Sequence, residues 1–137
     1  MRTHVHALTD SIYGADVQLL VGAKPCLTSW LTRHGYPPDD EEASADGKTI
    51  ELVHPTRGAV WIVWLPPDVA LSTIAHECVH LAAEVLRDRD VVLTRDSEEA
   101  YAYYVSAMFE QMRAALHPTR RPSPRRRRRR RRRRDAA

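Results

Sequence analysis

Apolar residues recur at helical spacing over residues 69–86, and this segment contains neither glycine nor proline. Pro66 and Pro67 end the segment before it, and Asp68 or Ser72 is placed to act as the N-cap residue. The apolar side chains cover almost every face of the predicted helix. Since a helix that is apolar all round is buried in a soluble protein, we expect this helix to lie in the core.

Two further helices are predicted, one on each side of it. Residues 25–34 hold apolar residues at i, i+3 and i+4, with a proline at the start and a glycine directly after the end. The last helix is predicted to begin after Asp96 or Ser97 and to continue to about Leu116. Two glutamates occupy its first turn, where the helix dipole favours acidic side chains.

Three segments have the composition of β-strands. Residues 49–54 and 59–65 are rich in β-branched and aromatic residues, and a short connection with proline and glycine between them predicts a hairpin. Residues 16–21 form a further short strand, and residues 37–47 are polar and predict an exposed loop. The order β-α-β-β-α-α predicts an α+β domain. In it, a short, mostly antiparallel sheet packs on the helix at 69–86 and on the helix that follows.

Charge is distributed unevenly along the 137 residues, whose formal net charge is +3. The segment 118–137 holds twelve of the 21 basic residues, ten of them in the run from Arg125 to Arg134, and only one acidic residue. Residues 1–117 therefore carry a net charge of −8 and the tail carries +11. Because consecutive arginines repel one another and bury nothing, we expect a folded domain over 1–117 and a disordered tail over 118–137.

The arginine tract has three interpretations. It can bind DNA, RNA or an acidic protein surface, because arginines that neutralise a polyanion release its counterions. It can also be a low-complexity tail without a function, or it can fold back loosely on the acidic domain.

The sequence indicates a cytoplasmic protein. No apolar run is long enough to cross a membrane, and the first ten residues lack the apolar core of a secretory signal. The two cysteines, Cys26 and Cys78, are too few for a disulfide framework, so we expect reduced thiols.

The predicted central helix contains the motif H-E-x-x-H, formed by His76, Glu77 and His80. Residues four apart share one face of a helix, so both imidazoles can reach one zinc ion, and the glutamate is placed to act on a water beside it. With seven histidines and eight glutamates in the chain, the motif is expected by chance about 0.02 times. The alternative is that both histidines are hydrogen-bonded core residues. Cys78 points away from the predicted metal.

A catalytic zinc site usually has a third protein ligand and leaves the fourth position open. One known pattern places a glycine and a third histidine three and six residues after the second histidine. Ala83 and Leu86 occupy these positions, which excludes that pattern. The other common solution is a glutamate from the following helix, where Glu98 and Glu99 are the two candidates.

H-E-x-x-H followed by E-x-x-A-Y on the next helix resembles the gluzincin metallopeptidases in their smallest, minigluzincin-like form, which occurs in bacteria and phages. The resemblance extends from the first predicted strand through the last helix and implies a small zincin-like domain. It implies zinc ligands at His76, His80 and Glu99. Glu98 fits less well, because it would place Tyr101 where the motif has a small alanine.

The resemblance also implies a mechanism in which a zinc-activated water attacks the peptide bond and Glu77 acts as the general base. Tyr103, four residues beyond the third ligand, is the candidate donor to the oxyanion, and Tyr104 and His54 are weaker candidates. The alternative role for Tyr103 is packing between helices. The strand at 59–65 could offer an edge on which an extended peptide pairs. The favoured alternative is that its Trp61 and Trp64 are packing residues.

Three functions are therefore compatible with the sequence. The first is a zinc metallopeptidase acting on peptides or proteins in the cytoplasm of a bacterial or phage-infected cell, without a membrane partner. The second is a non-catalytic, zinc-stabilised domain whose arginine tail binds nucleic acid in a phage or other nucleoprotein assembly. The third is a peptidase that the tail brings to nucleic-acid-bound substrates.

Overall fold

The computed structural model describes residues 3–39 and 46–118. The segment 119–137, which holds the predicted tail, lies outside the described residues, as does most of the predicted loop at 37–47. The described part forms four strands and three helices: β1 (His4–Leu8), β2 (Asp16–Val21), α1 (Pro25–Arg33), β3 (Lys48–His54), β4 (Gly58–Leu65), α2 (Leu71–Asp88) and α3 (Glu98–Leu116). This confirms the predicted α+β class.

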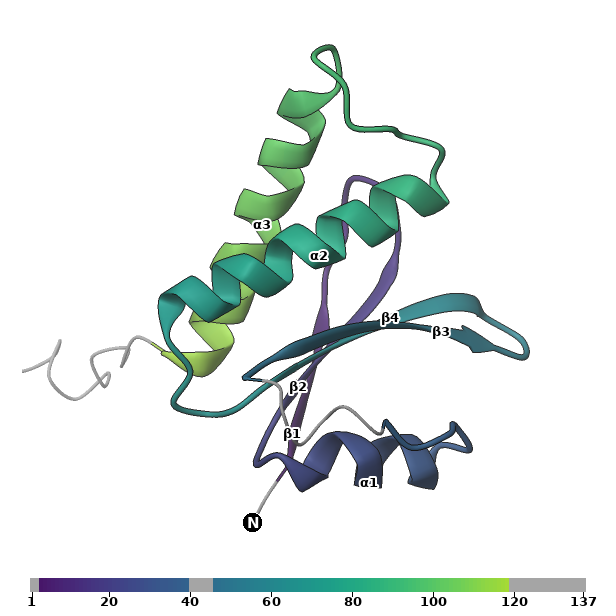
Figure 1. The fold of residues 1–137 in the computed structure, drawn as a ribbon, viewed down its shortest axis with the longest axis vertical. Helices are drawn as coiled ribbons and strands as arrows, with labels where there is room; N and C mark the ends of the chain where they lie inside the picture. Colours follow the sequence, from purple (N-terminus) through teal and green to yellow (C-terminus); the bar gives the residue numbers. More distant parts are fainter. Residues whose placement is uncertain (1–2, 40–45, 119–137) are drawn as a thin grey trace, which may run out of the picture.

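The strands form one mixed sheet in the order β1-β2-β4-β3 (Figure 1). β1 with β2 and β3 with β4 are antiparallel hairpins, whereas β2 and β4 run parallel in the centre. Because β4 is paired on both sides, the prediction that the strand at 59–65 offers a free edge is wrong. The edges of the described sheet are β1 and β3.

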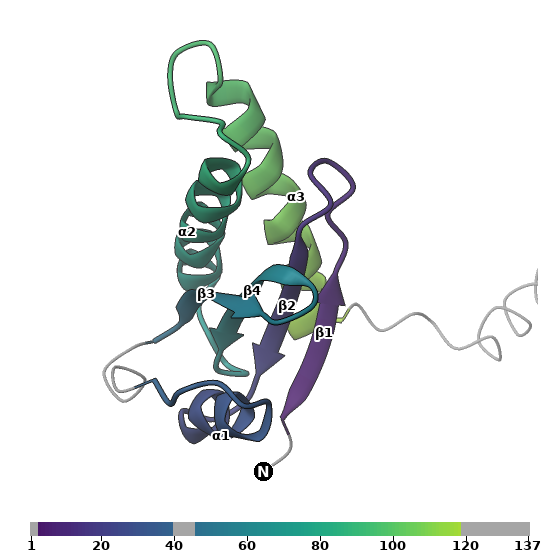
Figure 2. The same ribbon diagram turned by 90° about the vertical axis from the view of Figure 1, so that its right-hand side faces the viewer.

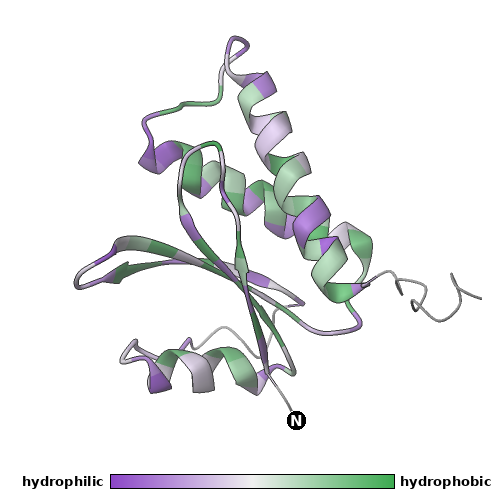
Figure 3. Cartoon of the chain, turned by 180° about the vertical axis from the view of Figure 1, so that it is seen from behind, coloured by the Kyte–Doolittle hydropathy of each residue, from purple (hydrophilic) through white to green (hydrophobic). Residues whose placement is uncertain are grey.

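The sheet separates two layers of helix (Figure 2). α1 covers one face, while α2 and α3 cover the other. Side chains on β4 alternate between the layers: Trp61 packs toward α2 and α3, and Trp64 packs toward α1. Both indoles are fully buried because helices cover both faces of this strand. Hydrophilic residues gather at the turns and helix ends (Figure 3).

The observed order is β-β-α-β-β-α-α, which differs from the predicted order by the additional strand β1. This strand lies at an edge of the sheet, and Leu8 is its only buried residue. A single buried residue in five gives almost no hydrophobic signal. The strand is defined instead by its pairing with β2, from His4 with Val21 to Leu8 with Val17.

The predicted N-caps of α2 are wrong. The helix begins at Leu71, with Ala70 at the N-cap position and no capping side chain. Asp68 falls too early, in a turn closed by the Val69 N–H and the Pro66 carbonyl, and Ser72 already lies in the first turn. Ser97 does occupy the N-cap position of α3, but its hydroxyl bonds to residues of the preceding loop.

α2 is also less buried than predicted. Ile74, Cys78, Leu81 and their neighbours face the core, but Val79 is 57% exposed, and the two histidines lie on the exposed side. None of the described helices is long and apolar enough to cross a membrane.

Candidate metal centre

His76 and His80 lie one turn apart on α2, and both rings are exposed. Their Nε2 atoms are 3.0 Å apart, and the rings meet edge to face. Two nitrogens bound at the usual distance to one tetrahedral zinc are about 3.3 Å apart. The pair is therefore close to the spacing that a shared ion requires. The alternative of two core histidines is wrong, because both rings lie at the surface.

Glu77 lies between this pair and the sheet. Its side chain is almost fully buried, at 5% exposed, and the Thr49 hydroxyl on β3 donates to its Oε2 atom over 2.7 Å. This hydrogen bond satisfies one carboxylate oxygen and fixes the side chain against the edge strand. The other oxygen, Oε1, has no partner among the described residues.

An open cleft of about 390 Å³ adjoins the histidines, between the start of β3 and the first turns of α2. Among the described residues, its walls are polar and include no large apolar side chain. The lining residues are Asp46, Gly47, Ser72, Thr73, His76 and Glu77. The cleft therefore gives water or a polar chain access to the carboxylate and to one imidazole together.

The described residues do not bring a third ligand to the pair. Among the described residues, no three His, Cys, Asp or Glu side chains are close enough to hold a metal ion. α3 packs on α2 through its C-terminal half, where Met112 Sδ lies 3.6 Å from Cys78 Sγ. Glu99 comes thirteen residues earlier, roughly 20 Å along the helix axis, and the first turns of α3 stand away from α2 (Figure 1). Its role as a ligand, and that of Glu98, stay predictions.

The predicted oxyanion donors have three different environments. Tyr103 is 68% exposed and does not pack between the helices, so the packing alternative is wrong and its role as a donor stays a prediction. Tyr104 is fully buried, and its hydroxyl donates to Asp10 Oδ2 over 3.1 Å. Burial, together with the Asp10 charge, raises the pKa of Tyr104. His54 accepts backbone N–H groups of the β3–β4 turn through Nδ1. Tyr104 and His54 therefore have structural roles.

Cys78 points into the core, as predicted. Burial, and to a lesser extent the Glu77 charge, raises the pKa of its thiol to about 12. Both cysteines are buried, and the sheet separates them: Cys26 belongs to the layer of α1 and Cys78 to the layer of α2 and α3. Neither thiol is a metal ligand here.

Sequence reasoning missed Thr49, Asp46 and Gly47. In the sequence Thr49 is one β-branched residue of a strand pattern, and Asp46 is one acid of a polar loop. Only the packing of β3 on α2 brings them to the histidines.

Comparisons of the chain with protein-family models, with curated protein sequences and with solved structures found no match. The minigluzincin resemblance therefore stays a prediction. The arguments for a function rest on the geometry of His76, Glu77 and His80 and on the residues around them.

Proposed function

We propose that the chain is a zinc-dependent metallopeptidase in which His76 and His80 bind the ion and Glu77 is the general base. One observation carries the proposal: two imidazole nitrogens 3.0 Å apart lie beside a buried carboxylate on the same helix, at an open cleft. A purely structural zinc site has no use for a base, and it closes its fourth position with a protein ligand.

Glu99 completes the ligand set in this proposal, and Glu98 is the alternative. Both side chains are exposed, and neither makes a hydrogen bond or ion pair with the described residues. Binding requires the first turns of α3 to approach α2. This movement would break the hydrogen bond from the Tyr101 hydroxyl to the Val91 carbonyl and the packing of Tyr101 on the core. Tyr103, one helical turn beyond Glu99, would arrive with it.

In this proposal, the zinc ion, Glu77 and β3 each have a separate role in peptide hydrolysis. A bound zinc ion would polarise the peptide carbonyl and lower the pKa of a water molecule. The Thr49 hydroxyl holds Glu77 Oε2, so Oε1 is left to take a proton from the attacking water and to pass it to the leaving amine. β3 is an edge strand of the described sheet, and an extended peptide could pair with its outer side beside the cleft.

Metal analysis tests the ligand set. We expect one zinc per chain in the purified protein, with loss of the metal in His76→Ala and Glu99→Ala. The controls are Glu98→Ala and His117→Ala, which remove an adjacent acid and an exposed histidine and should retain zinc. If zinc were retained in Glu99→Ala but lost in Glu98→Ala, the third zinc ligand would be Glu98 instead of Glu99. A protein that binds no zinc after reconstitution would exclude the proposal.

Glu77→Gln tests catalysis separately. The substitution removes the base but keeps the size of the side chain, so hydrolysis of a peptide library should fall by roughly 100- to 10,000-fold. Zinc content and thermal stability should stay close to those of the original protein. Equal activity in both proteins would show that Glu77 is not the base.

The second candidate function is nucleic-acid binding by a zinc-stabilised domain, and the run from Arg125 to Arg134 is the observation that favours it. Under this function, Glu77→Gln changes nothing, whereas removal of the tail abolishes binding.

A further inference from the structure

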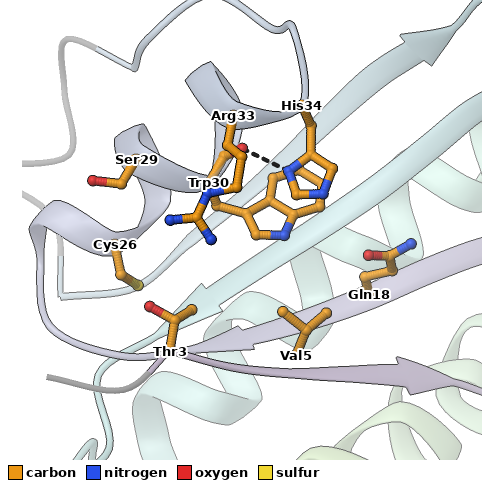
Figure 4. Close-up of a pocket in the computed structure, with 8 residues that line it drawn as sticks. All are labelled: Thr3, Val5, Gln18, Cys26, Ser29, Trp30, Arg33 and His34. Carbon is orange, nitrogen blue, oxygen red and sulfur yellow. Dashed lines mark hydrogen bonds between the residues drawn. The ribbon is translucent and has the colours of Figure 1, made fainter.

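A second cavity, of about 350 Å³, lies on the opposite face of the sheet, between α1 and the hairpin of β1 and β2 (Figure 4). Three elements and the residue before β1 contribute to it. The lining residues are Thr3, Val5, Gln18, Cys26, Ser29, Trp30, Arg33 and His34. Because the sheet separates this cavity from His76 and His80, it is independent of the proposed metal centre.

The polar groups of the lining are mostly hydrogen-bond donors. Arg33 and the Trp30 indole N–H can only donate, and the hydroxyls of Thr3 and Ser29 can donate as well. No described aspartate or glutamate belongs to the lining. The Arg33 guanidinium forms no ion pair within the described ranges. Figure 4 shows this group and the Trp30 indole nitrogen turned toward the space above Thr3 and Val5.

The Trp30 side chain is held in place by aromatic neighbours. The His34 ring stacks on it with centroids 4.0 Å apart and an angle of 22° between the planes. Tyr36 stacks at 6.3 Å and 8°. The His34 Nδ1–H donates to the Trp30 carbonyl over 2.8 Å, which leaves Nε2 toward solvent. One wall of the cavity is therefore fixed before any ligand binds, which lowers the entropy cost of binding.

An apolar surface adjoins these donors. Val5, which is 49% exposed, and Cys26 at the start of α1 both line the cavity, so a short hydrophobic group can rest against them. The size of the cavity lies at the lower end of the range for small-molecule sites.

We infer that this cavity binds a small organic anion, with a carboxylate or phosphate head and a short apolar body. The acidic head group accepts hydrogen bonds from Arg33, the Trp30 N–H and the Thr3 hydroxyl. The apolar body of the ligand contacts Val5. A guanidinium supplies paired donors for either head group, and an uncharged ligand would leave it unpaired.

The indole N–H signals of the three tryptophans report on binding in the full chain by NMR. We would titrate inorganic phosphate and, separately, benzoate at ionic strength held constant with sodium chloride. The Trp30 signal should shift saturably with at least one probe. Trp61 should not shift, because it is fully buried on the other face of the sheet. A response to phosphate alone or to benzoate alone identifies the head group.

Arg33→Gln should weaken this binding roughly tenfold or more, because it removes a charged donor pair. The matched control is Arg95→Gln, which removes an exposed arginine between α2 and α3 and should leave the affinity unchanged. Thr3→Val, which deletes one donor without changing the charge, should also weaken binding. The inference is overturned by the absence of a saturable Trp30 shift, or by equal affinities in the Arg33 and Arg95 variants.

Discussion

Gly47 lies where β3 meets α2, directly beside the candidate base. A Cβ atom at this position would lie 2.9 Å from Leu65 Cδ2, 3.1 Å from Glu77 Cγ and 3.2 Å from Thr73 Cγ2. All three distances are shorter than ordinary packing contacts between carbon atoms. The absence of a side chain therefore lets the start of β3 approach the helix and keeps Thr49 within reach of the carboxylate.

Gly47→Ala should lower the free energy of unfolding by roughly 1–3 kcal/mol, because the added methyl group overpacks this contact. It should also lower peptidase activity by displacing Glu77. Chemical denaturation measures the first effect. Ser72→Ala is the control: its exposed side chain lines the same cleft, and its stability should change by less than about 0.5 kcal/mol. Equal stability of the two variants would mean that β3 moves freely over α2.

Tyr104 and Tyr103 are neighbours on α3 with opposite environments. The pKa of Tyr104 is raised by burial and by the nearby Asp10, so its hydroxyl stays protonated in the folded protein at a pH where the unfolded chain ionises. The stabilisation is complete below about pH 10, the ordinary value for tyrosine, and is lost as the pH rises above it.

Tyr104→Phe should therefore make the decline of stability between pH 9 and pH 11 shallower, measured by denaturation at several pH values. At pH 7 it should cost about 1–2 kcal/mol, because Asp10 loses one donor. Tyr103→Phe, at a 68% exposed position, should change neither quantity. If stability fell equally steeply with pH in both variants, the raised pKa of Tyr104 would not be the cause of the decline.

At the scale of elements, the backbone turn at the end of α2 sets the direction of the connection that leads to α3. Asp90 follows the helix with φ of 57°, in the left-handed region that few residues other than glycine and asparagine or aspartate adopt. The N–H groups of Arg89 and Asp90 bond to carbonyls of the last turn and close the helix.

Asp90→Val should destabilise the protein by about 1–2 kcal/mol, because a β-branched side chain is strained at this angle. Asp90→Gly should be neutral or slightly stabilising. Thermal unfolding distinguishes the two variants. If valine were tolerated as well as glycine, the turn after α2 would have to adopt another conformation.

The hairpin of β3 and β4 could be predicted from its β-branched and aromatic composition and its turn, since β4 is a continuous apolar run without a period of two. β2 could be predicted as a short apolar segment. The helices could be predicted from apolar residues at helical spacing and from the residues at their ends. β1 could not be predicted, since an edge strand with one buried residue is defined by its partner. The N-caps of α2 were wrong because backbone turns, not side chains, begin that helix. His76, Glu77 and His80 follow from local spacing. Thr49 and Gly47 depend on tertiary packing, which no local pattern contains.

At the scale of the whole molecule, the chain joins an acidic domain of net charge −8 to a tail of +11. If the tail binds DNA or RNA, deletion of residues 118–137 should abolish that binding. The stability of the domain should not change, because Pro118, the one residue of this segment that the structure describes, is exposed and outside the core clusters. Affinity of the full chain should fall steeply with salt, measured by fluorescence anisotropy between 50 and 200 mM, on the order of tenfold or more. If the truncated protein still bound DNA or RNA, the binding site would lie in the domain and not in the tail.

The topology of the sheet has a consequence for the order of folding. β3, β4 and α2 follow one another along the chain, so the contact of Thr49 with Glu77 spans only 28 residues. The parallel pairing of β2 with β4 joins residues 44 apart, from Asp16 with Val60 to Val21 with Leu65. Closing that loop costs more chain entropy than forming either hairpin, so it is the slower event. The candidate site can therefore assemble as a local unit first, and the nucleation barrier of the domain lies at the central strand pair.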